Sequence, residues 1–534
     1  MTVSVYPRRE FETRQRLFSA LASAFDVDFV LSDVPPGPEL PAIIFSDSAD
    51  AAPHSGPTLS IYPTKKLDAP EPFSLKFSPA IPETRPFHTS LLTEKRVWAP
   101  RALAPVPGEQ IIATLDGGPV WLQTSEKENI HTSHFALRTS YRASCAPEEL
   151  PPNSALADHL TDENGFGLLP LVVFLRSVCG ISIPPIRASF IVDDPNIRSG
   201  SYGCINFAAL AAEARRSHFH ISFATIPIDF WMSLRKMAKF FVESGDVLSL
   251  LLHGNNHTHA ELNSQPNREA ELRLVRQMIA RTNRFEKKNH LNISRIVAPP
   301  HGMCSRSMLS ALRTGGLDAV VVSRPSPWRV QSEERELVDG NVLQGWLPAD
   351  YVDGMPILNR RKILTNIRFL AFLGKPIIPY FHHDDFSGGY GTLVDFASQI
   401  NALGDVQWGS MENCAHSNYL TTIEGSLLRV MPFSRTVRVH LPEGIDRMQI
   451  SLPSDGTLFT ETVAAIGGHE YSFSIRDSWG TTEEISVKPG EVIVQLRDRI
   501  PIKLPEIPWY SAPPRAYLRR LLTEVRDRVY PFWH

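Results

Sequence analysis

The stretch RASFIVDDPN occupies residues 187–196 and opens the most regular part of the chain. RASFIV has the composition of a buried β-strand, and similar short runs follow, among them HISFATI at 220–226 and VLSLLL at 247–252. Helical stretches alternate with these runs, which is typical of parallel βα units, and the series continues to DVQW at 405–408. The pattern predicts an α/β fold with a distorted (β/α) barrel of about seven units.

The segments on either side of this barrel follow other patterns. Residues 1–150 mix short apolar runs with turn signals and indicate an N-terminal α/β or α+β domain of unknown role. The barrel unit is expected to span 151–418, including a lead-in helix. Residues 419–505 alternate with a period of two and predict a β-sandwich, and 506–534 predict an amphipathic helix that docks on a neighbouring domain or on a partner. The apolar face of that helix carries Leu518, Leu521, Leu522 and Val525.

Composition narrows the classes of function. The formal net charge is -3 and the pI is near 6.7, so the broad basic field of a nucleic-acid-binding protein is missing and no nucleic-acid partner is expected. The longest apolar run, at 166–175, is interrupted by Pro170, whereas a membrane span needs about 20 residues, so no span is expected. The five cysteines form no C-x-x-C pair and the N-terminus lacks the apolar core of a signal peptide, which favours a cytoplasmic protein.

The first chemical motif is FIVDDPN, which places Asp193 and Asp194 directly after the first predicted strand. The active sites of (β/α) barrels lie at this end of the strands. Neighbouring carboxylates repel each other, so one is expected to bind a cation while the other remains a base. An Asp-Pro turn with a helix N-cap would also explain the pair.

The second motif is LLLHGNNHTH, in which His253 and His257 are four residues apart. Imidazoles at this spacing can converge on one metal. The intervening Gly, Asn and Asn exclude the helical zincin motif, which needs a Glu there. His259 forms an H-x-H pair with His257, so the choice of the second ligand stays open between them, and a hydrogen-bonded loop is the alternative to a metal site.

The third motif is PYFHHDDFSGGYG, which holds His382 and His383 at the end of a predicted strand. Adjacent residues on a strand face opposite ways, so only one of the two histidines is expected to point into the barrel mouth. The other would be structural.

One aspartate and two histidines supply three protein ligands and leave a coordination position open. This is the composition of a catalytic rather than a structural zinc site. The same ligand set serves non-haem iron oxygenases, but those usually occupy double-sheet β folds. The sequence therefore predicts a divalent metal, with zinc favoured.

In order and spacing, these motifs resemble those of the polysaccharide deacetylases, metal-dependent carbohydrate esterases with a distorted βα barrel. The resemblance covers residues 187–410 approximately. It implies that Asp193 is the catalytic base. The implied metal ligands are Asp194, His253 and His257.

Two further motifs of that family have counterparts here. The segment APPHGMCS at 298–305 is similar to a Pro-rich turn that walls the family's substrate groove. The residues with implied substrate contacts are Pro300, His301 and Gly302. The family's last motif, a strand ending in a general-acid His that is followed by Asp, is matched best by His383, with His382 as the alternate.

Two positions depart from the family pattern. The Arg that opens the Pro-rich motif is replaced by Ala298, and Arg295 just upstream is the candidate substitute. The Asp-x-x-Asp-Trp motif that orients the base is echoed by Asp350 and Asp353, with Gly354 in place of Trp. The chain is therefore expected to be a divergent member.

The resemblance implies a metal-dependent hydrolase that removes an acyl group, by family frequency an N-acetyl group, from a sugar or polysaccharide precursor. The expected partner is then an acylated glycan or a lipid-linked or nucleotide-linked sugar precursor. Two alternatives stay open. One is a metal-independent glycoside hydrolase that uses Asp193 and Asp384, and the other is a degenerate barrel that binds glycans without activity.

Overall fold

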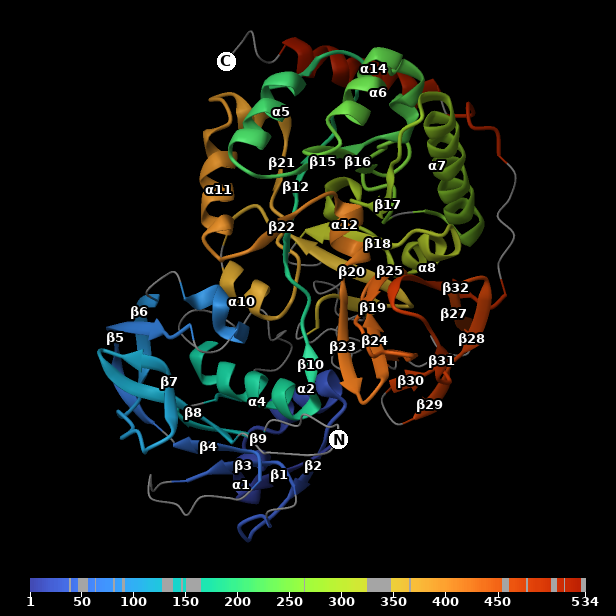
Figure 1. Cartoon of the computed structure of the whole chain (residues 1–534). Helices are drawn as coiled ribbons and strands as arrows, with labels where there is room; N and C mark the ends of the chain where they lie inside the picture. Colours follow the sequence, from blue (N-terminus) through green and yellow to red (C-terminus); the bar gives the residue numbers. More distant parts are fainter. Residues whose placement is uncertain are drawn as a thin grey trace.

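The computed structural model of the chain consists of an N-terminal sheet, a central α/β part and a β-rich part (Figure 1). Among the described helices, none combines the length and the apolar character that a membrane crossing requires. The described residues are 1–37, 40–46, 56–62, 64–79, 82–88, 92–126, 138–145, 147–149, 165–263, 265–323, 347–364, 366–453, 461–476, 479–500, 507–512 and 514–529.

The N-terminal part is one nine-stranded mixed sheet with helices packed against it. Its elements are β1 (Thr2–Tyr6), α1 (Arg8–Glu12), α2 (Gln15–Phe25), β2 (Asp28–Leu31), β3 (Ala42–Phe45), β4 (Thr58–Tyr62), β5 (Lys65–Phe77), η1 (Pro82–Phe87), β6 (Leu92–Ala99), β7 (Glu109–Leu115), β8 (Gly118–Glu126), β9 (Arg138–Ser144), η2 (Gly165–Gly167) and α4 (Leu169–Cys179). The pairs β1–β2, β1–β3, β3–β4 and β4–β9 are parallel, and the others are antiparallel. Helix α4, the expected lead-in helix of the barrel, buries Leu171, Val172 and Phe174 in the core of this sheet.

The central part is built on seven parallel strands. They are β12 (Phe190–Asp193), β15 (Ile221–Thr225), β16 (Leu248–Leu252), β17 (Ser294–Val297), β18 (Ala319–Ser323), β20 (Met355–Arg360) and β21 (Tyr380–Phe381), and they lie side by side in the order β20-β18-β17-β16-β15-β12-β21. The short β19 (Asp350–Val352) pairs antiparallel with β20. Arg361 and Pro379, next to the two outer strands of the row, form an isolated parallel bridge. The α/β character of the prediction is confirmed.

Helices and short strands connect these seven strands or flank them in the chain. The helices are α5 (Phe207–Arg216), η3 (Pro227–Met232), α6 (Arg235–Glu243), α7 (Arg268–Asn289), η4 (Pro300–Gly302), α8 (Arg306–Thr314), α10 (Ile367–Phe372), η6 (His383–Phe386), α11 (Gly391–Asn401) and α12 (Met411–His416). The short strands are β10 (Ile181–Ser182), β11 (Ile186–Ala188), β13 (Ser201–Tyr202), β14 (Ile205–Asn206) and β22 (Val406–Trp408). The longest helix, α7, begins at Asn267, whose side chain accepts a hydrogen bond from the N–H of Ala270, and ends at His290 in a left-handed conformation.

Side chains alternate along the central strands, and β12 shows the consequence. Phe190 and Val192 belong to the core that the helices cover, whereas Ile191 belongs to a second core on the other face. Because alternate residues of a strand point to opposite faces, Asp193 lies on the same face as Ile191. A polar group at the end of an apolar inner face marks the place where chemistry can occur.

The β-rich part shares that second core. Its strands are β23 (Tyr419–Glu424), β24 (Leu427–Pro432), β25 (Thr436–Leu441), β26 (Arg447–Pro453), β27 (Thr462–Ile466), β28 (His469–Ser472), β29 (Ser474–Arg476), β30 (Trp479–Thr481), β31 (Ile485–Ser486) and β32 (Gly490–Asp498), arranged in two sheets. Phe433, Val437 and Leu452 from this part form one hydrophobic cluster with Ile191 and Leu251 from the central strands. The β-rich part is therefore packed into the central part. The predicted boundaries at 150/151 and 505/506 lie outside the described residues.

Candidate metal centre and active site

The predicted chemical motifs meet at the carboxyl ends of the central strands, and we call the space there the mouth. Asp193 is the last residue of β12 and Asp194 follows it. His253 directly follows β16, and His382 directly follows β21. Parallel neighbouring strands bring these ends to one edge, which is why motifs far apart in sequence can form one site.

Three of the predicted residues converge as a candidate metal centre. Asp194, His253 and His257 each offer a ligand atom, and these atoms all lie within 4.8 Å of one another. Asp194 Oδ1 is 3.5 Å from His253 Nε2 and 3.2 Å from His257 Nε2. Ligand atoms around a tetrahedral zinc with bonds of about 2.0–2.1 Å are about 3.3 Å apart, so the spacing fits a shared cation. His259, the other candidate ligand, is exposed to solvent.

The surroundings of the Asp194 carboxylate suit a bound cation. Among the residues that the structure describes, its Oδ1 is buried and accepts no hydrogen bond. Burial alone would raise the pKa of Asp194, but the imidazoles of His253 and His257 outweigh it and hold the pKa well below its usual range. The backbone φ of Asp194 is 78°, a left-handed conformation that costs a non-glycine residue free energy. An ionised, buried oxygen that faces two imidazole nitrogens fits a divalent cation.

A neighbouring carbonyl fixes the tautomer of His253. Its Nδ1 lies 2.7 Å from the carbonyl oxygen of Ala298, and the imidazole is buried. A carbonyl can only accept a hydrogen bond, so Nδ1 carries the proton. In the neutral ring Nε2 then keeps its lone pair and faces Asp194, which is the arrangement of a metal-binding histidine.

Glu261 holds the loop that carries His257. Its buried Oε1 accepts hydrogen bonds from the backbone N–H groups of Asn255, Asn256 and His257 at 2.6, 2.8 and 2.9 Å. Three converging donors fix the backbone of a loop that has no regular secondary structure. Glu261 was not predicted from the sequence, although its place four residues after His257 is a signal for such a loop anchor.

Gly254 lies in this loop at a position that has no room for a side chain, so Gly254→Ala should destabilise the protein. The φ of Gly254 is +64°, and an added Cβ would lie 2.5 Å from Glu261 Oε1 and 2.8 Å from Pro300 Cγ. We expect a loss of about 1–3 kcal/mol in the free energy of unfolding, measured by denaturant titration. The matched control is Gly388→Ala, where a Cβ would meet nothing within 4 Å. Equal losses in the two variants would contradict this account.

Asp193 is held by Arg360 rather than by the metal ligands. Its Oδ1 accepts a hydrogen bond from Arg360 Nη1 at 2.6 Å, and both side chains are buried. The guanidinium also lies 4.6 Å from the centroid of the Tyr380 ring. Burial alone would raise the pKa of Asp193, but Arg360 and His253 outweigh it and keep the pKa below its usual value. Asp193 is therefore an ionised carboxylate with one oxygen already engaged.

Within the described part of the chain, the hydrogen bonds and ion pairs of Asp193 include neither Arg295, the candidate substitute in the Pro-rich motif, nor Asp350 and Asp353, which echo the base-orienting motif. Arg295 pairs with Glu286 at 2.7 Å, and Asp353 pairs with Arg306 at 2.6 Å. Asp350 lies in β19, at the edge of the row. Arg360, which ends β20, takes this place instead. Sequence reasoning missed Arg360 because the strand before it has no regular pattern.

The two adjacent histidines point to different partners. His382 is 44% exposed, and its Nε2 lies 3.9 Å from Asp193 Oδ2. His383 is the first residue of η6, and its Nε2 lies 3.4 Å from Asp527 Oδ1. An added Cβ on Gly203 would lie 2.3 Å from His383 Nδ1, so the glycine makes room for this buried ring. The structure thus brings His382 to Asp193, although the family's motif order favoured His383.

Pro300, His301 and Gly302 form η4 beside the candidate metal centre. The exposed His301 ring lies 5.6 Å, centroid to centroid, from the ring of His257. Desolvation and the neighbouring His257 lower the pKa of His301. Pro300 packs against the loop at Gly254, and a Cβ on Gly302 would lie 2.6 Å from Ser323 Oγ. His301 is the residue of this motif whose side chain borders the open side of the centre.

A C-terminal helix, α14 (Pro514–Val529), lies over one side of the mouth (Figure 1). Asp527 Oδ2 accepts a hydrogen bond from the Tyr202 hydroxyl at 2.6 Å. Arg520 forms a buried ion pair with Asp229 at 2.6 Å. Sequence reasoning missed these contacts because nothing in a single sequence links residues 291 positions apart.

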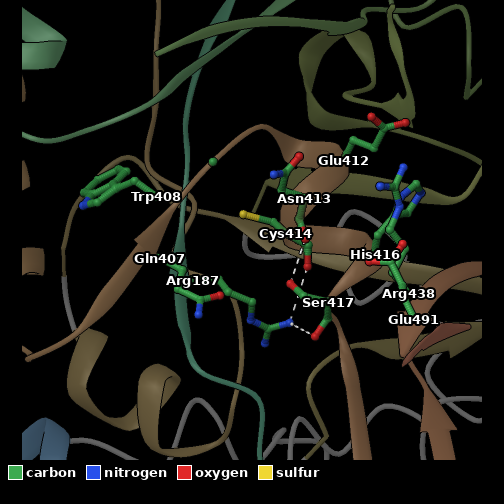
Figure 2. Close-up of a pocket in the computed structure, with 11 residues that line it drawn as sticks. Arg187, Gln407, Trp408, Glu412, Asn413, Cys414, His416, Ser417, Arg438 and Glu491 are labelled. Carbon is green, nitrogen blue, oxygen red and sulfur yellow. Dashed lines mark hydrogen bonds between the residues drawn. The ribbon is translucent and has the colours of Figure 1, made fainter. Parts of the chain in front are cut away.

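A separate pocket of about 410 Å³ lies beside β22 and α12 (Figure 2). It is lined by Arg187, Trp408, Cys414 and His416, among others, and contains none of the residues of the metal centre. The buried Arg187 guanidinium donates to the Ser417 carbonyl at 3.0 Å and to Asn418 Oδ1 at 2.8 Å. These bonds tie β11 to the segment that leads into the β-rich part, which is a structural role.

Comparisons with known proteins give structural similarities alone. No protein-family model and no curated protein matches the chain. A Mycobacterium smegmatis protein assigned as a polysaccharide deacetylase has 10% identity and a TM-score of 0.30, covering 43% of this chain and 90% of its own. The Xyl-CE4 domain of a multidomain xylanase from the hindgut metagenome of Trinervitermes trinervoides has 10% identity and a TM-score of 0.20, with coverage of 42% and 98%. A Coccidioides immitis protein assigned as a fructose-1,6-biphosphate aldolase has 13% identity and a TM-score of 0.22, with coverage of 44% and 89%. At TM-scores this low, the geometry of the site has to carry any functional conclusion.

Proposed function

We propose that the chain is a metal-dependent hydrolase that removes an acyl group, an N-acetyl group above all, from a sugar or sugar precursor. One observation carries the proposal. The ligand cluster of Asp194, His253 and His257 lies beside a buried carboxylate, Asp193, which in turn faces an imidazole, His382. The arrangement places a candidate cation site, a candidate base and a candidate acid together at the mouth.

We extend the proposal to the arrangement of the central strands and to the identity of the metal. We propose that the seven central strands form a distorted barrel, and the bridge between Arg361 and Pro379 supports this because it links the outer strands. The favoured metal is zinc, since one carboxylate and two imidazoles leave coordination positions open. The choice of a sugar as the substrate rests on the resemblance of the sequence motifs to those of the polysaccharide deacetylases. All five thiols are free, which supports a reducing compartment such as the cytoplasm.

The chain's own groups have distinct roles in this chemistry. Asp194, His253 and His257 would hold a divalent cation, which would supply Lewis acidity toward the acyl carbonyl and water. Asp193 takes a proton from the attacking water on Oδ2, while Arg360 holds Oδ1 and keeps the group aimed. His382, across from Oδ2, gives a proton to the leaving amine or alcohol.

The glycosidase alternative fits the site less well. A glycosidase acid needs a raised pKa, whereas Arg360 helps to lower the pKa of Asp193. Asp384, the second carboxylate of that alternative, is exposed to solvent on η6. Neither carboxylate has the environment of such an acid.

The experiment that tests the proposed function is Asp193→Asn. The amide keeps the shape of the side chain and still accepts from Arg360, but it cannot take up a proton. We expect acetate release from a panel of N-acetylated oligosaccharides to fall by about 10²–10⁴-fold. Bound metal, measured by elemental analysis, should stay at the wild-type level. Loss of the metal would mean that Asp193 is itself a ligand, and wild-type protein without metal or without acetate release would overturn the proposal.

The acid is tested by His382→Ala. Protonation matters for a poor leaving group such as an amine and little for an activated aryl alcohol. We expect turnover of N-acetyl amides to fall by about 10²-fold or more, while turnover of aryl acetates stays near the wild-type rate. His383→Ala is the matched control and should lack this selectivity, because His383 contacts Asp527 instead. If the selective loss occurs in His383→Ala, the acid is His383.

A further inference from the structure

Helix α14 exposes its apolar face and buries its charged one. Leu518, Leu522 and Val525 are 59%, 61% and 61% exposed, whereas Arg520, Glu524 and Asp527 are 4%, 3% and 1% exposed. Leu521 and Val529 continue the apolar line at 41% and 42% exposure. We call these five residues the apolar stripe. The helix thus docks on the central part through its charged face, while the apolar face that the sequence indicates stays exposed in the described structure.

The buried contacts explain why the helix is oriented this way. Arg520 pairs with Asp229, Glu524 pairs with Arg198, and Asp527 accepts from Tyr202. Turning the apolar stripe inward would leave the buried Asp229 without its partner, at a high cost in free energy. The polar contacts thus hold the stripe outward.

Aromatic and apolar side chains extend the exposed surface next to α14. Trp231 is 54% exposed, and its ring lies 6.3 Å from that of Tyr517 on α14. Leu234, three residues further on, is 55% exposed. Tyr510, just before the helix, is 63% exposed. Exposed tryptophan and tyrosine beside an apolar stripe are typical of surfaces that enter the interface of a lipid bilayer.

The charges around the stripe are mainly basic. On α14, Arg515 and Arg526 are exposed, while the two acidic residues of the helix, Glu524 and Asp527, are buried. Helix α6, which begins four residues after Trp231, adds exposed basic residues and one exposed acidic residue, Glu243, whose Oε1 lies 3.4 Å from Lys239 Nζ. The basic residues of α6 are Arg235, Lys236 and Lys239. An apolar stripe flanked by Arg and Lys is complementary to an anionic lipid surface.

We propose that α14, together with residues 231–239, binds an anionic membrane surface, with the apolar stripe in the boundary between headgroups and acyl chains. A second copy of the chain is the weaker occupant, because a symmetric pairing of this face would set its Arg and Lys residues against one another. The proposal rests on the outer face of α14 alone and does not depend on the proposed chemistry. Because the inner face of α14 lies over the mouth, bound protein would have its mouth next to the headgroups.

The experiment is co-sedimentation of the full chain with vesicles. Vesicles of phosphatidylcholine with about 30% phosphatidylglycerol should carry down the wild-type protein, and phosphatidylcholine vesicles should carry down much less. Replacing four residues of the stripe should lower the bound fraction about tenfold or more. The substitutions are Leu518→Ser, Leu521→Ser, Leu522→Ser and Val525→Ser. The matched control is the pair Ile423→Ser and Ile493→Ser, which are 53% and 45% exposed on the β-rich part and should leave binding unchanged.

Several results would overturn the proposal. One is wild-type protein that stays in the supernatant with the anionic vesicles, and another is a stripe variant that binds as well as the control pair. A wild-type dimer in sedimentation velocity that the stripe substitutions dissociate would assign the face to a second copy instead. Thermal melting checks that the stripe variant is folded. His257→Ala should bind vesicles like the wild type, so that failure of the chemistry and failure of the membrane contact are distinguishable.

Discussion

His257→Ala should lose its bound metal and with it acetate release. The imidazole of His257 is one of the three proposed ligand groups, and its Nε2 lies 3.2 Å from Asp194 Oδ1. Loss of a residue that only supports a ligand typically lowers metal affinity about 10–100-fold, so loss of a ligand should exceed about 100-fold. Metal content after dialysis and zinc affinity by chelator competition measure the effect.

His259→Ala is the control for this experiment. It removes an imidazole from the same loop, but His259 is exposed and lies outside the ligand cluster. We expect it to keep the metal at the wild-type level. If His259→Ala loses the metal and His257→Ala keeps it, the ligand is His259 and not His257.

Arg520→Ala should be the most destabilising single substitution on α14. Its guanidinium and the Asp229 carboxylate are both nearly inaccessible to solvent, and they form an ion pair at 2.6 Å. Removing the cation leaves a buried carboxylate without its partner, which typically costs about 3–5 kcal/mol. Denaturant titration should show this loss in the free energy of unfolding.

Two variants separate this effect from a general loss of charge. Arg526→Ala removes a guanidinium that is 70% exposed on the same helix, and it should cost no more than about 1 kcal/mol. The double variant Asp229→Asn, Arg520→Met should be more stable than Arg520→Ala, because it no longer buries an unpaired charge. If Arg520→Ala is no worse than Arg526→Ala, the ion pair does not hold the helix.

The local parts of the candidate site could be predicted from the sequence. Asp193 ends an apolar strand, Asp194, His253 and His382 each follow one directly, and the carboxyl ends of neighbouring parallel strands meet at one edge. The choice between His257 and His259 could not be made, because it depends on the loop conformation that Glu261 imposes.

The long-range parts of the site could not be predicted. Arg360 follows MPILN, a short run whose residues are nearly all buried and show neither a period of two nor a helical period. The orientation of α14 could not be predicted either. Amphipathicity identifies the two faces of a helix, but it does not show which face contacts the rest of the protein. Here a buried ion pair with Asp229 and a half-exposed one with Arg198 decide it, and those residues lie in distant parts of the sequence.

The contacts of α14 with the mouth also bear on how the protein folds. The pairs Tyr202–Asp527 and Arg198–Glu524 close loops of 325 and 326 residues. Closing so long a loop costs more chain entropy than pairing neighbouring βα units, so we expect these contacts to form after the strands have assembled. Docking of α14 is then a late event in folding and an early loss in unfolding, and the wall that it adds to the mouth is completed last.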